Sequence, residues 1–260
     1  MNLTPRSWLL VALSLGLFLL GYLLIIPKPE PAKLDPELNI ESEKVSEFNL
    51  AKISAENGNS EDQMILATFY AYGRGVPQDL TESAKWWFKA AEQGEAVAQM
   101  YLADHFTSGE NHFSKDPVAA ASWYRKAAEQ GIPSAQYSLG KCYANGEGLL
   151  KDEVEAITWC QRAADHGYGP AQSYIASCYA NGIGFRKNMT EAYAYLILAG
   201  VTNEDARTYR DRLEKDMSLA DRFHGQSRAK VLQLTIETNV RAMTARIAAK
   251  KAQAGKGSSK

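Results

Sequence analysis

The sequence is poor in the residues that build disulfide frameworks and metal sites. Its 260 residues contain three cysteines and four histidines. An odd number of cysteines does not fit a complete disulfide framework. Cys142 and Cys160 are the pair that a disulfide would join most easily, but three small buried side chains, the third being Cys178, are the simpler interpretation. No histidine lies four residues from another histidine or from a cysteine, so we expect neither a metal nor a cofactor.

The chain also lacks a strong charge of either sign. Its formal net charge is −1, which gives no global field for nucleic acid, and we expect no nucleic-acid partner. The two ends differ, because residues 30–62 are mostly acidic whereas residues 241–260 contain six Lys or Arg and no acid. A basic tail is usually only solvated; binding to an anionic lipid or a cell-wall polymer is the more specific interpretation.

Only one long hydrophobic run is present, and it lies near the N-terminus. Residues 8–26 carry no charge and have about the length that crosses a bilayer as a helix. The run continues into Pro27 and Lys28 without the small-x-small pattern of a cleaved signal. We therefore expect a short N-terminal tail (1–7), a transmembrane anchor helix (8–26) and a Pro-rich acidic linker (27–47).

The flanking charges decide the expected orientation of this anchor. Arg6 precedes the run and Lys28 and Lys33 follow it, so the positive residues are nearly balanced. Because a very short N-terminal tail usually stays in the cytoplasm, we expect a single-pass protein of the bacterial inner membrane, with the remaining chain in the periplasm. The alternative is a cytoplasmic-facing regulator that binds a signalling partner.

What the chain has in abundance is a repeated pattern. An alanine-rich segment with aromatic residues ends in Gly94, Gly131 and Gly167, which are 37 and 36 residues apart. The copies occupy residues 83–94, 120–131 and 156–167, with a degraded fourth copy at 192–199. A fixed step of this size indicates stacked supersecondary units.

A second pattern repeats in phase with the first. A glutamine, an aliphatic residue, a ring and a glycine each recur at steps of 36 or 37 residues. The four rows are Gln63, Gln99, Gln136 and Gln172; Leu66, Leu102, Leu139 and Ile175; Tyr70, Phe106, Tyr143 and Tyr179; and Gly73, Gly109, Gly146 and Gly182. The aliphatic residue and the ring lie on one stripe of a helix, and the glycine suits the left-handed residue after a helix.

A cap residue begins the second helix of each unit. Seven residues before each Trp or Tyr of the first pattern stand Asp79, Asp116, Asp152 and Asn188. Asp and Asn are favoured N-caps, and Glu82, Glu155 and Glu191, three residues later, predict capping boxes. Pro117 takes the first helical position in the unit that lacks this glutamate. Each unit is therefore predicted to be a helix, a glycine-containing loop and a second helix.

Leu139-Gly140-Lys141-Cys142-Tyr143, followed by Gly146-Glu147-Gly148 and an alanine-rich Trp segment, resembles the Sel-one-like repeat family, a relative of the tetratricopeptide repeats. The resemblance implies an all-α fold: a right-handed superhelical solenoid of antiparallel helix pairs, about four repeats of 36–37 residues within residues 48–200. Asn111, where a second loop glycine is usual, and Leu198, where lysine is usual, depart from the family pattern.

The ends of the array are predicted to be capped. Residues 51–58 look like a lone second helix, and residues 201–252 like capping helices over Asn203–Met217 and from Leu219 to about residue 250. An apolar stripe for docking on the last hairpin consists of Leu232, Ile236, Val240, Met243 and Ile247. Residues 253–260 are expected to form a basic disordered tail.

Apparent catalytic motifs compete with the repeat for the same residues. Ser138-x-x-Lys141 and Ser227-x-x-Lys230 match the Ser-x-x-Lys of penicillin-binding proteins, but no partner motif accompanies them. The Gly-x-Gly loops follow helices rather than strands, which favours helix capping over phosphate binding. His166 occupies a position that is glutamine in two other units, a solvated slot. We expect no enzyme; a β-lactam-binding or β-lactam-hydrolysing enzyme, described for cysteine-rich members of the family, is the alternative.

The expected function is recognition. The resemblance and the expected anchor at residues 8–26 together imply a membrane-anchored scaffold or adaptor of the cell envelope. It is expected to bind peptides or proteins on the concave face of the solenoid, which the first helices line. Residues offset from the buried stripe are predicted to line this groove. They are Met64, Thr68 and Tyr72; Met100, Asp104 and Ser108; Tyr137, Lys141 and Asn145; and Ser173, Ser177 and Asn181.

Overall fold

The computed structural model describes residues 47–110 and 113–257, and every regular element in these ranges is an α-helix. The all-α prediction is therefore confirmed for this part of the chain. The predicted tail (1–7), anchor (8–26) and most of the linker lie outside the described residues. None of the helices within the described ranges is long and apolar enough to span a membrane.

Eight of the described helices form four hairpins. The hairpins are α4 (Ser60–Tyr72) with α5 (Leu80–Glu92), α6 (Ala96–Ser108) with α7 (Pro117–Glu129), α8 (Pro133–Asn145) with α9 (Glu153–Asp165), and α10 (Gly169–Asn181) with α11 (Met189–Ala199). Helix α3 (Glu47–Glu56) precedes them, and α12 (Glu204–Asp216) and α13 (Leu219–Gly257) follow. The hairpins fall on the four predicted repeats.

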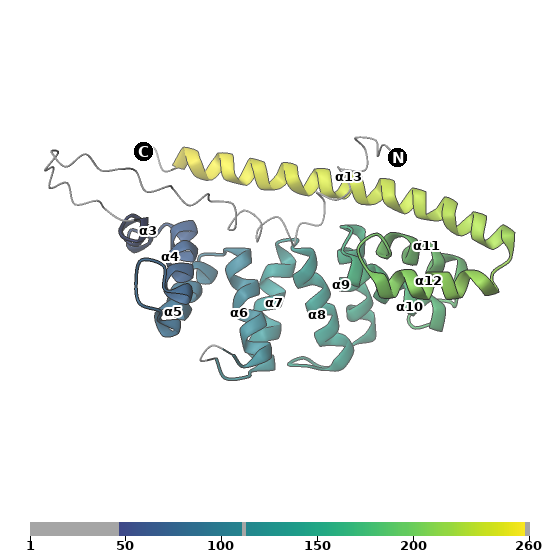
Figure 1. Cartoon of the computed structure of the whole chain (residues 1–260), viewed down its shortest axis with the longest axis horizontal. Helices are drawn as coiled ribbons and strands as arrows, with labels where there is room; N and C mark the ends of the chain where they lie inside the picture. The colour runs from purple at the N-terminus through teal and green to yellow at the C-terminus, as the bar shows by residue number, and fades with distance from the viewer. Residues whose placement is uncertain (1–46, 111–112, 258–260) are drawn as a thin grey trace, which may run out of the picture. The chain divides into compact units, whose positions relative to one another are not determined.

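The described residues divide into two compact units, with the boundary inside α6 between residues 98 and 99. In the first unit α3 packs on α4, and α4 packs on α5, so the predicted lone capping helix is confirmed. In the second unit consecutive hairpins stack, because α7 packs on α8 and α9 packs on α10 (Figure 1). The handedness of the superhelix stays a prediction.

The second helix of every hairpin begins where the sequence predicts. The side chain of each cap residue accepts two backbone N–H bonds from the first turn, for example 2.9 Å from Glu82 N to Asp79 Oδ1. In a capping box the glutamate side chain also accepts the backbone N–H of the cap residue. This part of the prediction is wrong. Each cap backbone N–H donates instead to the ring residue's carbonyl on the preceding helix, as from Asp152 to Tyr143 at 3.0 Å. This bond joins the two helices of a hairpin.

Glycines fit the loops between the two helices closely. Gly146 and Gly182 end their helices with φ of 74° and 75°, the left-handed conformation predicted for them. The second loop glycine has a different function: a Cβ at Gly148 would lie 1.9 Å from the carbonyl oxygen of Pro117 in the preceding hairpin. A side chain there would therefore push two stacked hairpins apart. Asn111, the predicted departure at this position, lies outside the described residues.

The glutamine row is buried and joins three helices. Gln136 Nε2 donates to the carbonyl of Ala128 on the preceding second helix at 3.2 Å. In the first two hairpins the glutamine Oε1 accepts from a glutamine at the end of its own second helix, Gln93 at 2.7 Å and Gln130 at 2.9 Å. A buried amide with both of its ends bonded fixes the register of neighbouring helices. The row was visible in the sequence, but this function was not predicted.

The third hairpin has His166 where the first two have Gln93 and Gln130. Its Nδ1 lies 2.8 Å from the carbonyl oxygen of Arg162, and Gln136 Oε1 is left without a hydrogen-bond partner among the described residues. The two glutamines are exposed, as expected of a solvated slot, yet each also satisfies a buried amide. The position therefore has a structural function as well.

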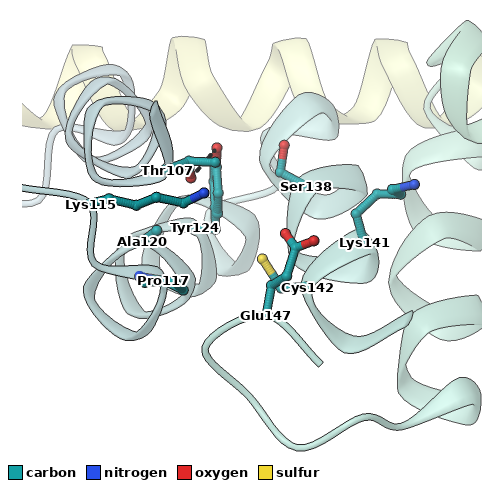
Figure 2. Close-up of a pocket in the computed structure, with 9 residues that line it drawn as sticks. All are labelled: Thr107, Lys115, Pro117, Ala120, Tyr124, Ser138, Lys141, Cys142 and Glu147. Atoms are coloured by element: carbon teal, nitrogen blue, oxygen red, sulfur yellow. Dashed lines mark hydrogen bonds between the residues drawn. The ribbon is translucent and has the colours of Figure 1, made fainter. Parts of the chain in front are cut away.

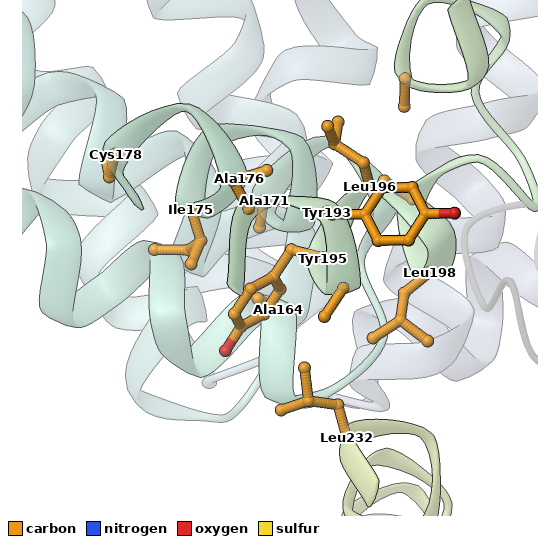
Figure 3. Close-up of a cluster of buried hydrophobic side chains, with 14 of the residues drawn as sticks. Ala164, Ala171, Ile175, Ala176, Cys178, Tyr193, Tyr195, Leu196, Leu198 and Leu232 are labelled. Atoms are coloured by element: carbon orange, nitrogen blue, oxygen red, sulfur yellow. The ribbon is translucent and has the colours of Figure 1, made fainter. Parts of the chain in front are cut away.

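Helices α12 and α13 cover the last hairpin. Figure 3 shows Leu198 and Leu232, from α11 and α13, within one cluster of buried side chains that also contains Tyr193 and Leu196. Leu198 is only 8% exposed, so it replaces the usual lysine because this surface of α11 is buried. The departure noted in the sequence thus has a packing reason.

Helix α13 follows the prediction only in part. Leu232 and Val240 of the expected stripe are buried, Ile236 and Met243 are half-buried, and Ile247 is exposed. The stripe therefore docks as far as about Val240, where α13 packs on α11 and α9 (Figure 1). The helix runs to Gly257, so the predicted boundary at residue 252 and the disordered tail from 253 are wrong for residues 253–257.

Candidate functional site

All the predicted groove residues lie on first helices, and none of them is buried. Met64, Thr68 and Tyr72 belong to the first unit and the other nine belong to the second. Helix geometry explains the exposure, because these residues are offset from the buried stripe of Leu66, Leu102, Leu139 and Ile175.

A polar network centres on Asp104 of α6. The Tyr124 hydroxyl on α7 donates to Asp104 Oδ1 at 2.6 Å, and Thr107 Oγ1 lies 3.3 Å from the same hydroxyl. Removal from water raises the pKa of Asp104, although its bond with Tyr124 acts in the opposite direction. Burial and the neighbouring carboxylate also raise the pKa of Tyr124. Asp104 is thus a fixed acceptor that stays open to a partner.

A pocket of about 330 Å³ lies beside this network, between the hairpins α6–α7 and α8–α9. Figure 2 shows the Lys115 side chain reaching toward Thr107 and Tyr124, and the Glu147 carboxylate beside Cys142. The complete lining is Thr107, Lys115, Pro117, Ala120, Tyr124, Ser138, Lys141, Cys142 and Glu147. The walls are therefore apolar near α7 and polar at the α6 and α8 sides.

Sequence reasoning missed most of this lining. Of the predicted groove residues only Lys141 takes part, and Asp104 lies one hydrogen bond away through Tyr124. Lys115 and Glu147 come from the loops between the two helices of a hairpin, which sequence reasoning assigned to capping alone. The available signal was that the unit containing Lys115 has one inserted residue in its loop.

The Ser138-x-x-Lys141 motif does not form a nucleophile and base pair. In Figure 2 the Lys141 side chain points away from Ser138. Ser138 instead lines the pocket together with Tyr124. A nucleophilic serine needs a base within hydrogen-bond distance. No bond between Ser138 and Lys141 is present among the described residues.

The cysteines are unsuited to nucleophilic chemistry or to metal binding. Cys142, Cys160 and Cys178 are free and buried, as the simpler interpretation predicted. Burial raises the pKa of Cys142 to about 11 and that of Cys160 to about 12, so both stay thiols at neutral pH. Over residues 47–110 and 113–257, no group of three or more His, Cys, Asp or Glu residues could hold a metal ion.

Two tyrosines extend the polar surface toward the next repeat. Tyr137 of α8 and Tyr168, at the N-cap of α10, have ring centroids 5.6 Å apart. Burial raises the pKa of both hydroxyls, and the charge of Asp104 raises that of Tyr168 further. Tyr137 was predicted from the sequence; Tyr168 was not, because it precedes the helix on which the groove pattern was counted.

Second helices carry a different row of side chains. Lys126 Nζ lies 3.7 Å above the Trp123 ring and Arg162 Cζ 4.4 Å above the Trp159 ring, each pair within one helix. These cations are satisfied by the neighbouring rings, at about 0.5–1 kcal/mol for exposed pairs. The row therefore stabilises the second helices and does not leave an open charge for a partner.

The comparisons with known proteins agree with the hairpin pattern. The family model of the Sel1 repeat matches residues 60–95, 96–132, 133–168 and 169–200, one match for each hairpin. No curated protein matches the chain.

Several solved structures are similar to the chain, and two of them are at least 30% identical to it. One is a protective antigen present in uropathogenic Escherichia coli strains, displaying an SLR fold; its TM-score is 0.62, at 30% identity over 77% of this chain and 42% of that one. The other is a Sel1 repeat protein from Oxalobacter formigenes, with a TM-score of 0.56 at 34% identity, over 60% of this chain and 64% of that one. The chain thus spans less than two thirds of either protein. From the four repeat matches and the hairpins beneath them, the chain belongs to the Sel1 repeat family.

Proposed function

We propose that the chain is a scaffold that binds a peptide segment of a protein partner across the first helices α6 and α8. Sel1 repeat proteins generally serve as scaffolds for protein–protein interaction, which supports the class of function. The observation that carries the proposal is the pocket between these two hairpins, because its polar wall adjoins groove residues predicted independently from the sequence. Pockets with apolar walls and a few fixed polar groups suit side-chain recognition.

The charges beside the pocket favour one orientation of a bound peptide. Asp104 on α6 and Lys141 on α8 occupy equivalent positions one repeat apart. Packed helices lie about 8–10 Å apart, which an extended peptide covers in about three residues. A bound segment with a basic residue near α6 and an acidic residue near α8 therefore complements the surface. A side chain between them would enter the pocket, near Lys115 and Ser138.

The test is selection of peptides on the immobilised full chain, followed by affinity measurements on variants. Reversal of both charges, Asp104→Lys with Lys141→Glu, is expected to weaken binding of the selected peptides about tenfold, mainly through slower association. Glu129→Lys with Lys215→Glu is the matched control, because both residues are exposed and lie outside the site. Unchanged affinity of every selected peptide for the double reversal would show that the site lies elsewhere.

The location of this scaffold is part of the same proposal. The uncharged run of residues 8–26 supports a single membrane anchor, and the prolines of the linker support an extended spacer that holds the repeats away from the bilayer. The repeats would then work in the periplasm as an envelope adaptor. A reporter fused after residue 260 tests this: activity of a cytoplasmic reporter alone would contradict export and favour the signalling regulator.

A further inference from the structure

Helix α13 has one face that packs on the fold as far as about Val240. A Cβ at Gly225 would lie 2.6 Å from the Tyr193 ring, so α13 and α11 approach closely there. Arg228 Nε donates to Glu191 Oε1 at 2.9 Å, and Asn239 Nδ2 donates to the Asp165 carbonyl at 3.0 Å. Together with buried Leu232, these contacts fix which side of α13 points inward.

The opposite face carries large apolar side chains in water. Phe223, Val231 and Leu234 are 67%, 52% and 64% exposed. At 100° per residue they lie on one side of the helix, away from Leu232 and Val240. The smaller residues Ser227 and Thr238 lie on the same side and are exposed as well.

Helix α13 is also the positively charged part of the molecule. Residues 219–257 contain eight Lys or Arg and two Asp or Glu, a surplus of six positive charges, whereas the whole chain carries −1. The remaining residues therefore carry −7. Arg228 pairs with Glu191 and Arg222 with Glu214, both outside α13. Lys230 and Arg241 are exposed and lie on the same side of the helix as Phe223 and Leu234.

We propose that this outer face of α13 lies on an anionic lipid surface. An interfacial helix has an apolar face that enters the headgroup boundary and Lys or Arg residues that reach the lipid phosphates. Phe223, Val231 and Leu234 supply the apolar side chains, and Lys230 and Arg241 supply the positive charges. The basic end from residue 241 onward, for which the sequence left open solvation, an anionic lipid or a cell-wall polymer, would then add to this surface.

The same charges argue against a second copy of the chain as the occupant. Two paired α13 helices would bring together surpluses of six positive charges each, and like charges at close range repel. An anionic bilayer neutralises these charges instead. The proposal is independent of the peptide site on α6 and α8, and it does not use residues 8–26.

The test reports the surroundings of α13 directly in the full chain, so that an N-terminal anchor cannot produce the signal. Thr238→Cys places an environment-sensitive fluorophore on the outer face, and Ser122→Cys places it on α7 as a control. The native thiols are buried and have raised pKa values, so labelling is selective at neutral pH. The labelled chain is reconstituted in phosphatidylcholine vesicles with or without phosphatidylglycerol.

We expect the label at residue 238 to shift to the blue and to escape an aqueous quencher only with phosphatidylglycerol, while the label at residue 122 does not change. Phe223→Ser with Leu234→Ser should weaken this transfer about tenfold. Lys230→Glu with Arg241→Glu should abolish its dependence on anionic lipid. Val118→Ser with Val154→Ser, an exposed apolar pair on α7 and α9, is the matched control.

Three results would overturn the proposal. They are a label at residue 238 that stays in water with both lipids, labels at 238 and 122 that respond alike, and a lipid-independent signal that depends on protein concentration, which indicates self-association. Thermal unfolding of the variants checks that they fold. None of these results bears on peptide binding at α6 and α8.

Discussion

The hairpins α8–α9 and α10–α11 share one backbone plan but differ in what covers them. In α9 the position three residues after Trp159 holds Arg162, which stacks over that ring from the surface. In α11 the equivalent position holds buried Leu198, packed in the cluster that Leu232 of α13 completes. The same structural position is thus cationic where it meets water and apolar where the chain covers it. Departures from a repeat therefore identify covered surfaces.

The largest loss of stability is expected when the difference between Arg162 on α9 and Leu198 on α11 is reversed. Leu198→Lys would place an ammonium among apolar neighbours, and burial of an unpaired charge should lower the free energy of unfolding by about 3 kcal/mol. Urea titration of the full chain measures it. The matched change Arg162→Leu lies at the exposed position and should cost less than about 1 kcal/mol. Equal losses for the two variants would show that cover by α13 does not explain the departure.

The next largest loss of stability is expected where the two helices of the hairpin α8–α9 approach closely. A Cβ at Gly140 would lie 2.5 Å from Cys160 Sγ and 2.9 Å from the Ala156 carbonyl oxygen, whereas α10 has buried Ala176 at this position. Gly140→Ala should therefore destabilise α8–α9 by about 1–3 kcal/mol through overpacking. In a double-mutant cycle, Cys160→Ala should recover part of this loss. Strict additivity would exclude contact with the thiol as the cause.

A smaller gain is expected from the unsatisfied glutamine of the third hairpin. His166→Gln supplies the donor that Gln93 and Gln130 supply in the first two hairpins. Pairing the buried Gln136 Oε1 should raise the free energy of unfolding by about 1 kcal/mol, measured by thermal unfolding. Gln130→His should remove about the same amount from the second hairpin. A neutral result in both directions would mean that the glutamine pair contributes nothing to stability.

The smallest effect is a pH dependence at Asp104. Burial raises its pKa in the folded chain, so the protein favours the protonated acid and loses stability as pH rises from the ordinary pKa of aspartate through the raised value. Asp104→Asn keeps an acceptor for the Tyr124 hydroxyl but does not titrate. The free energy of unfolding of the variant minus that of the native chain should therefore increase as pH rises from the ordinary pKa of aspartate to the raised one. Below this range the difference should be constant. A difference that does not change with pH would contradict the raised pKa.

The fold could be predicted from the sequence because the cap residues and glycines of each repeat mark where its helices begin and end. Asp79, Asp152 and Asn188 predicted helix starts, and Gly146 predicted a helix end, since each satisfies a local need that few residue types meet. The site was less predictable. Lys115 and Glu147 approach the pocket only after two hairpins stack, and such contacts carry no periodic signal. For the same reason the sequence showed the inner stripe of α13 but not its exposed outer face.

Hydrogen exchange of the full chain, with and without a selected peptide, tests the central claim most directly. It compares the open hairpins with the covered one in a single measurement, because backbone amides in each helix report their own protection. The scaffold account predicts that bound peptide slows exchange in α6 and α8 while α11 exchanges as before. Protection confined to α11, or to the second helices α7 and α9, would contradict recognition on the first-helix face.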